Sequence, residues 1–289
     1  MRRSVDTGSL RMGKKKRPAP PQLAHPIIDS HCHLDAEALG DEMSLTDVVA
    51  RAQAAGVNGF ITIGSGWGID CAHRAVALAE EHAGCVWATV GIHPHDASQY
   101  SDEVEETLGR LGSRPQVVAI GEMGLDFHYD NSPRDIQRAA FRRQIRLAMA
   151  LEKPVVIHDR SSGGETFEIL RDEGAFAAPS AVLFHCFAGD VSAMETIVEE
   201  GGWISLSGIV TFKNATEIHE VARAVPADRL LVETDSPFLA PVPWRGRTNE
   251  PRNVVYTLAH IADLRGVCRD ELAKQTAENT HTVFRLPTP

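Results

Sequence analysis

The 289-residue sequence has few of the features of secreted or membrane proteins. Its cysteines are odd in number and form no CxxC pair: Cys32, Cys71, Cys85, Cys186 and Cys268. This pattern argues against a disulfide framework and indicates reduced thiols in a cytosolic protein. No stretch approaches the roughly 20 consecutive apolar residues of a membrane span. We therefore expect a cytoplasmic protein that does not enter a membrane.

Positive charge is scarce outside the N-terminus. Residues 1–24 contain seven Lys/Arg and one Asp, whereas the remainder contains 22 Lys/Arg against 38 Asp/Glu. An acidic body is poorly suited to non-specific duplex binding, because Lys and Arg must neutralise the phosphates. Any nucleic acid would be held by a local basic site, a bound metal or the tail. We predict that residues 1–25 form a disordered basic tail and residues 26–289 a single domain.

Short apolar runs alternate with longer amphipathic segments from residue 26 onward. The predicted strands are residues 26–34, 59–64, 86–93, 117–126, 154–160, 181–187, 203–208 and 230–236. The predicted helices are residues 44–55, 68–83, 101–112, 133–153, 164–173, 191–201, 215–224, 252–265 and 269–284. Near-continuous apolar strands indicate burial on both faces. Eight strand–helix repeats predict an α/β fold, a (β/α)8 TIM barrel, in preference to an open doubly wound sheet.

Ionisable residues interrupt this apolar pattern near the C-terminal ends of five predicted strands. They are His31 and His33 in SHCHLD, Glu122 in GEMGLD, His158 in PVVIHDR, His185 in VLFHCF and Asp235 in ETDSPFL. The spacing of His31 and His33 directs both rings to the same face of a strand. Because the C-terminal strand ends of a barrel open on the face that carries active sites, we predict that all six side chains converge.

Four imidazoles and two carboxylates without a thiolate indicate a divalent-metal centre. Each residue alone could instead be a buried polar side chain or a helix cap. Imidazole with carboxylate suits Zn, Mn, Co, Ni or Fe(II) better than Mg. Six ligands suit two ions that share a carboxylate, which we assign to Glu122. Cys32 should point to the opposite strand face, and Asp29 either orients a ligand histidine or is an ordinary buried partner.

Several longer motifs occur in a fixed order: SHCHL, GIHPH, GEMGLD, PVVIHDR, VLFHCFAGD, SGIVTFKNA and ETDSPFLAPVPWRGRTNEP. With these motifs the chain resembles the TatD family of metal-dependent deoxyribonucleases, a branch of the amidohydrolase-like TIM barrels. The resemblance runs from about residue 26 to residue 284. It implies a two-metal hydrolase acting on DNA phosphodiesters, and its metal ligands fall on the same six residues. Family members are often described as Mg-dependent, so the working metal stays open.

The function that we predict is therefore a metal-dependent DNase, either a 3′–5′ exonuclease or a repair-type endonuclease. We expect a monomer acting on single-stranded DNA or strand ends. A metal-bridging hydroxide would attack phosphorus, with Glu122 holding both ions and Asp235 orienting or deprotonating the water. In one alternative, the same metal centre hydrolyses an ester or amide bond, such as the aminoacyl ester of a D-aminoacyl-tRNA. The least favoured alternative is a metal-binding protein without turnover.

A second set of residues could contact the substrate: His93, His95, Lys213, Arg245 and Arg247. The two histidines lie in GIHPH, after the third strand, where a substrate contact and a structural role are equally expected. Lys213 would clamp the scissile phosphate, and the two arginines lie in a Pro- and Gly-rich loop of the kind that carries binding residues. In the same loop Trp244 stacks on a base or, in the favoured interpretation, packs the loop down.

Overall fold

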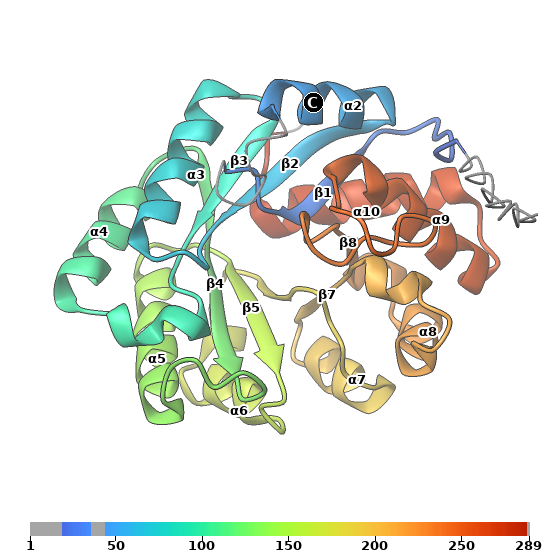
Figure 1. Ribbon diagram of the computed structural model, residues 1–289. Helices are drawn as coiled ribbons and strands as arrows, with labels where there is room; N and C mark the ends of the chain where they lie inside the picture. Colours follow the sequence, from blue (N-terminus) through green and yellow to red (C-terminus); the bar gives the residue numbers. More distant parts are fainter. Residues whose placement is uncertain (1–18, 36–43, 288–289) are drawn as a thin grey trace, which may run out of the picture.

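The computed structural model describes residues 19–35 and 44–287 of the chain (Figure 1). Most of the predicted tail, residues 1–18, therefore lies outside the described residues. In the part of the tail that is described, Leu23 packs against the hydrophobic core. The backbone N–H of Ala24 donates a hydrogen bond to Oδ1 of Asp270 at 2.7 Å. The last residues before the first strand are thus held against the C-terminal helix.

Eight parallel strands follow one another around the sheet in chain order, which confirms the predicted (β/α)8 barrel. The strands are β1 Ile27–Cys32, β2 Val57–Gly64, β3 Val86–Val90, β4 Val117–Asp126, β5 Val155–Arg160, β6 Val182–Phe184, β7 Trp203–Leu206 and β8 Leu230–Val232. The first and last strands meet where the backbone N–H of Asp235 donates to the carbonyl of His31 at 2.9 Å. This junction places the two ends of the sheet, and the polar residues on them, side by side.

Helices surround the strands (Figure 1). They are α2 Leu45–Ala54, α3 Ile69–Glu81, α4 Asp102–Gly112, α5 Arg134–Ala150, α6 Glu165–Asp172, α7 Val191–Glu199, α8 Thr216–Ala224, α9 Val254–Arg265 and α10 Arg269–Phe284. The longest helix, α5, carries an apolar stripe in which Phe141 and Ile145 are buried. None of the described helices is long and apolar enough to cross a membrane.

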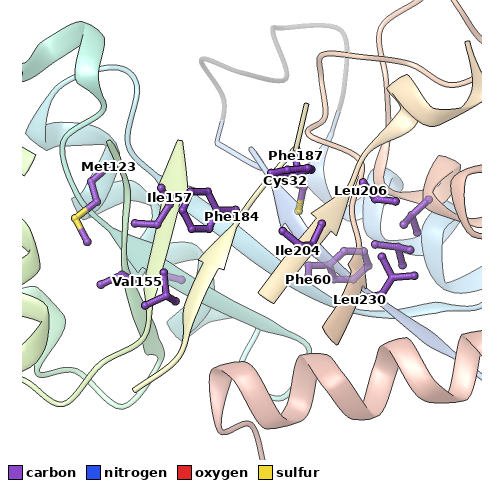
Figure 2. Close-up of a cluster of buried hydrophobic side chains, with 14 of the residues drawn as sticks. Cys32, Phe60, Met123, Val155, Ile157, Phe184, Phe187, Ile204, Leu206 and Leu230 are labelled. Carbon is purple, nitrogen blue, oxygen red and sulfur yellow. The ribbon is translucent and has the colours of Figure 1, made fainter. Parts of the chain in front are cut away.

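Apolar side chains from the strands fill the interior and the space beneath the helices. Phe60, Phe184 and Ile204 come from three different strands and lie in the same buried cluster (Figure 2). Cys32 belongs to this cluster, and its thiol lies 3.5 Å from the carbonyl oxygen of Ile61. Its side chain therefore points away from the two flanking histidines, as the strand alternation predicts.

Five strands, β1, β3, β6, β7 and β8, end earlier than the sequence predicts, and three of these changes affect ligand candidates. β1 ends at Cys32, β6 at Phe184 and β8 at Val232, so His33, His185 and Asp235 lie just beyond their strands. The backbone leaves the extended region there, with positive φ at Cys186 (42°) and Asp235 (53°). A residue in the left-handed region cannot continue a strand ladder. The apolar run predicts the strand, but the polar residues at its end belong to the turn.

Candidate metal centre

The six predicted ligands meet at the C-terminal end of the barrel. Their potential ligand atoms form groups of three within 4.8 Å of one another. One group is His31, His33 and Asp235, and a second is His31, Glu122 and His185. A third group contains Glu122 and His158 together with His93, which the sequence placed among the substrate contacts.

Glu122 lies at the middle of this cluster. Its Oε1 is 2.7 Å from Nε2 of His185 and 2.8 Å from Nδ1 of His158, while its Oε2 is 3.5 Å from Nε2 of His31. One carboxyl group therefore faces histidines from both sides of the cluster. This is the geometry expected of a carboxylate shared by two metal ions.

The GEMGLD motif brings Glu122 to this position because β4 and β5 approach each other closely. A Cβ built on Gly124, whose φ is +148°, would lie only 1.9 Å from the carbonyl oxygen of His158. Only glycine fits such a backbone contact. The backbone N–H of Glu122 also donates to the Ser65 hydroxyl at 3.2 Å, which ties β4 to the loop after β2.

Asp235 completes the other side of the cluster. Its Oδ1 lies 3.6 Å from Nε2 of His33 and 3.7 Å from Nε2 of His31. Burial alone would raise the pKa of Asp235, but His33, His31 and His185 outweigh that effect and lower it. The side chain is therefore a carboxylate at neutral pH, which is the form that binds a metal or accepts a proton.

The pKa values of His31 and His185 shift in opposite directions within the cluster. Burial and the nearby His185 lower the pKa of His31, so this ring is neutral. Burial also acts to lower the pKa of His185, but Glu122 and Glu233 outweigh it and raise that pKa well above its usual range. Burial would raise the pKa of Glu122, yet His185 and His93 hold it well below the usual range. The metal-free cluster thus has a proton on His185 that a metal ion would displace.

The donor set fits divalent metal ions. Both ring nitrogens of His31 and Nδ1 of His33 are buried and have no hydrogen-bond partner among the described residues. A buried polar atom without a partner is costly, and a neutral imidazole nitrogen aimed at carboxylates is a common metal ligand. The rings of His31 and His185 stack at a centroid distance of 3.8 Å with an angle of 9°. Repulsion does not oppose this contact when at most one of the two rings is protonated.

Two carboxyl groups beside the cluster, those of Glu233 and Asp126, were not predicted from the sequence. Glu233 is fully buried, and its Oε1 lies 3.3 Å from Nδ1 of His185 and accepts a hydrogen bond from the Cys186 backbone at 2.8 Å. Asp126 lies 3.2 Å from Nε2 of His158 and 2.8 Å from Nε2 of His95. Carboxyls that face the far nitrogen of a ligand histidine fix the ring orientation. Glu233 stands two residues before Asp235, a spacing that could have identified it.

Asp29 does not orient a ligand histidine ring. Its carboxyl accepts hydrogen bonds from the backbone N–H of Thr234 at 2.9 Å and from the Thr234 hydroxyl. Asn249 is also buried, and its side-chain NH2 donates to the Thr234 carbonyl at 2.9 Å. These contacts clamp the residue before Asp235. The second of the two interpretations of Asp29, a buried polar partner, is therefore the one that the contacts support.

The predicted substrate contacts separate into two groups. His93 and His95 lie at the cluster, since Nε2 of His93 is 3.4 Å from Oε1 of Glu122 and His95 pairs with Asp126. Lys213, Arg245 and Arg247 are exposed on the surface, and their contact with substrate stays a prediction. The guanidinium of Arg245 stacks on the ring of Phe212 at 4.3 Å.

Trp244 packs its loop against the core. It is half-buried, contacts the core cluster and lies under the guanidinium of Arg252 at 5.0 Å. Glu250, in the same loop, pairs with Arg51 of α2 at 2.7 Å and with Arg252 at 3.2 Å. These contacts favour the packing role for Trp244 over base stacking. They also fix the long loop that follows Asp235.

Comparison with known proteins gives a consistent result. The family model described as TatD related DNase matches residues 28–285. The chain is 39% identical over 260 residues to the uncharacterized metal-dependent hydrolase YabD of Bacillus subtilis, covering 90% of this chain and 99% of that protein. It is 38% identical over 245 residues to the 3′-5′ ssDNA/RNA exonuclease TatD of Citrobacter koseri, covering 83% of this chain and 92% of that protein.

Solved structures agree with the sequence matches. The crystal structure of the TatD homolog YJJV from Escherichia coli superposes with a TM-score of 0.82 at 30% identity. That match covers 90% of this chain and 98% of the other. The family model spans the whole barrel, from the start of β1 to the end of α10. On these grounds the chain belongs to the TatD related DNase family.

Proposed function

We propose that the protein is a divalent-metal-dependent nuclease that hydrolyses phosphodiester bonds of single-stranded DNA or of DNA strand ends. The observation that carries this proposal is the set of three ligand groups, two of which share Glu122, at the open end of the barrel. A related protein of similar length is named a 3′-5′ ssDNA/RNA exonuclease, which supports the choice of nucleic acid. The 3′–5′ polarity is therefore the direction that we expect.

Two ions fit the ligand groups. His31, His33 and Asp235 would hold one ion, His158 and His185 the other, and Glu122 would face both. Divalent ions in such a pair polarise a phosphoryl oxygen and lower the pKa of bound water. Zn, Mn, Co and Ni suit this donor set, and Mg is the ion least matched to four imidazoles. His93 lies close enough to Glu122, at 3.4 Å, to act as a further neutral donor or a substrate contact.

Asp235 is the candidate proton acceptor. Its lowered pKa keeps it ionised at neutral pH, and its Oδ1 faces Nε2 of His31 at 3.7 Å and Nε2 of His33 at 3.6 Å. The other oxygen can accept the proton of an attacking water. Glu122, His33 and the rest of the cluster hold this geometry, while Lys213 would approach a phosphate from the surface.

The body of the protein carries an excess of acidic residues, so we expect binding to be concentrated at the centre. A strand end presents one phosphate to the cluster without laying a long duplex on an acidic surface. This arrangement favours an unpaired terminus over internal duplex DNA. It also predicts that affinity depends weakly on salt compared with proteins that contact many phosphates.

A substrate panel tests the proposal. End-labelled single-stranded DNA, duplex DNA and an aminoacyl ester of tRNA are incubated with the purified full chain, with and without a chelator. We expect the single strand to be degraded from its 3′ end, the activity to stop with chelator, and a nucleoside monophosphate to inhibit it. Hydrolysis of the ester with no DNA cleavage would reject the nuclease and favour the alternative bond.

A further inference from the structure

Two aromatic rings stand beside the metal centre on loops from opposite sides of the β1 strand. Trp67 lies on the loop after β2, and Phe238 lies on the loop after β8. Their planes are nearly parallel, at 15°, with ring centroids 6.4 Å apart. Trp67 is half-buried, while Phe238 is 48% exposed. The Phe238 ring therefore presents apolar surface to solvent at the edge of the polar cluster.

His33 closes one side of the space between these rings. Its ring is nearly perpendicular to Trp67, at 85° and 5.3 Å, and to Phe238, at 77° and 5.9 Å. The three rings thus form two parallel walls with a perpendicular floor, which we call the aromatic slot. Nε2 of the floor residue is 3.6 Å from Oδ1 of Asp235, so the slot opens directly beside the candidate metal centre.

We propose that the aromatic slot binds the unpaired nucleobase of the nucleotide next to the scissile phosphate. This inference rests on the proposed nuclease function and adds the part of the substrate that gives single-strand preference. A base can enter the slot only when its Watson–Crick partner does not hold it in a stack. Stacking on aromatic rings is tolerant of sequence, since every base has a π-face.

The dimensions of the slot suit a flat ring. A planar group stacked between two rings requires about 7 Å, because each contact takes about 3.5 Å. The two ring centroids lie 6.4 Å apart with nearly parallel planes, and an outward movement of the 48% exposed Phe238 side chain would open the space that a base needs. Cations of the described residues stack on other aromatic rings, such as Phe127 and Tyr129, and not on Trp67 or Phe238. The slot therefore suits a neutral planar group better than a phosphate.

Hydrogen bonds hold both walls in place. The backbone N–H of Gly68, next to Trp67, donates to Oδ2 of Asp96 at 3.1 Å. The backbone N–H of Phe238 donates to the carbonyl of Asp235 at 2.8 Å. The second wall is thus anchored to the residue that we assign to proton transfer. These bonds fix the backbone on which each ring stands, so only the Phe238 side chain has to move when the ligand arrives.

The experiment combines changes in the protein with changes in the substrate. Trp67→Leu and Phe238→Leu keep apolar volume but remove the π-face, and Trp67→Phe and Phe238→Tyr restore it. Single-stranded oligonucleotides carry one abasic residue at successive positions from the 3′ end. We expect each Leu variant to lower kcat/KM on the intact strand about tenfold, and the aromatic replacements to recover most of the activity.

The substrate change gives the decisive comparison. With the unchanged protein, one abasic position should lower kcat/KM about tenfold, and this loss should nearly vanish in Trp67→Leu. If the loss from the abasic position and the loss from Trp67→Leu instead multiply when combined, the slot is overturned. Multiplying losses in kcat/KM mean that the missing base and Trp67 do not contact each other. Unchanged kcat/KM in both Leu variants would overturn it as well.

A binding measurement separates this proposal from the nuclease proposal. If the protein cleaves no oligonucleotide at all, the nuclease assignment fails, and the slot is judged by titration of deoxyadenosine monophosphate into the metal-loaded full chain. Affinity that falls about tenfold in Trp67→Leu and returns in Trp67→Phe would support base binding. Equal affinity in all three proteins would reject it.

Discussion

The Nδ1 atom of His185 lies 3.3 Å from Oε1 of the fully buried Glu233, while its Nε2 lies 2.7 Å from Glu122. The ring is therefore held between a carboxyl that belongs to the candidate metal centre and one that stands behind it. This contact fixes which nitrogen faces the centre. It is also the clearest case in which a residue outside the six predicted ligands determines how one of them is oriented.

Replacement of Glu233 by glutamine tests this positioning role. The amide keeps the size and the hydrogen bond to the Cys186 backbone, but it removes the charge that supports the His185 proton. We expect metal affinity to fall by about 10–100-fold with little change in fold. Metal titration followed by elemental analysis measures this loss. Glu195→Gln, at an exposed position on α7, serves as the matched control; equal affinity in both variants would make Glu233 a packing residue.

Replacement of Asp235 by asparagine tests the proton acceptor. The change is nearly isosteric and leaves the backbone contact with His31 in place. We expect kcat on single-stranded DNA to fall by about 10²–10⁴-fold, which is the usual contribution of a general base. Steady-state kinetics and a thermal melt measure turnover and folding separately. A variant that folds normally and turns over at the rate of the unchanged protein would show that Asp235 is not the base.

Replacement of His158 by alanine separates a ligand from a structural histidine. The His158 ring is half-buried and contacts Glu122 and Asp126. Without this ring, Glu122 still pairs with His185 and Asp126 still pairs with His95. We expect the free energy of unfolding to change by only about 1 kcal/mol, while one metal ion per chain is lost. Denaturant titration and metal analysis on the same preparation test this. A chain that no longer folds would assign His158 to the core.

The pH dependence of metal binding follows from the proton on His185. The raised pKa of this histidine keeps the proton bound at neutral pH in the metal-free protein. A metal ion must displace it, so apparent affinity should fall about tenfold per pH unit below that pKa and level off above it. Calorimetric titration in two buffers of different ionisation enthalpy counts the released protons. Release of no proton at pH 7 would contradict the assignment of His185 as a ligand.

The barrel was predictable because each strand is a near-continuous apolar run and each helix has an apolar stripe. Ile120 in β4 and Phe141 in α5 are buried as those patterns require. The lengths of β6 and β8 were not predictable, since the backbone turns at Cys186 and Asp235 follow from local φ values rather than from hydrophobicity. The overestimate of strand length does not move His185 and Asp235 away from the cluster, because both residues lie just beyond the strand ends.

The contacts around the centre were harder to predict than the centre itself. In the sequence Asp126 and Glu233 cannot be distinguished from other acidic residues. Only the fold shows that they contact His158 and His185. The slot walls, Trp67 and Phe238, are 171 positions apart in the sequence and meet only because β1 pairs with β2 and closes against β8. Long-range proximity of this kind depends on strand order, which single-residue patterns do not contain.

We propose that this barrel face is a two-ion phosphodiesterase centre. The most direct test is elemental analysis of the purified full chain, with hydrolysis of end-labelled single-stranded DNA measured on the same sample before and after chelation. We expect about two divalent ions per chain, with cleavage that is lost on chelation and restored by added metal. A chain that binds no metal even after reconstitution would contradict it.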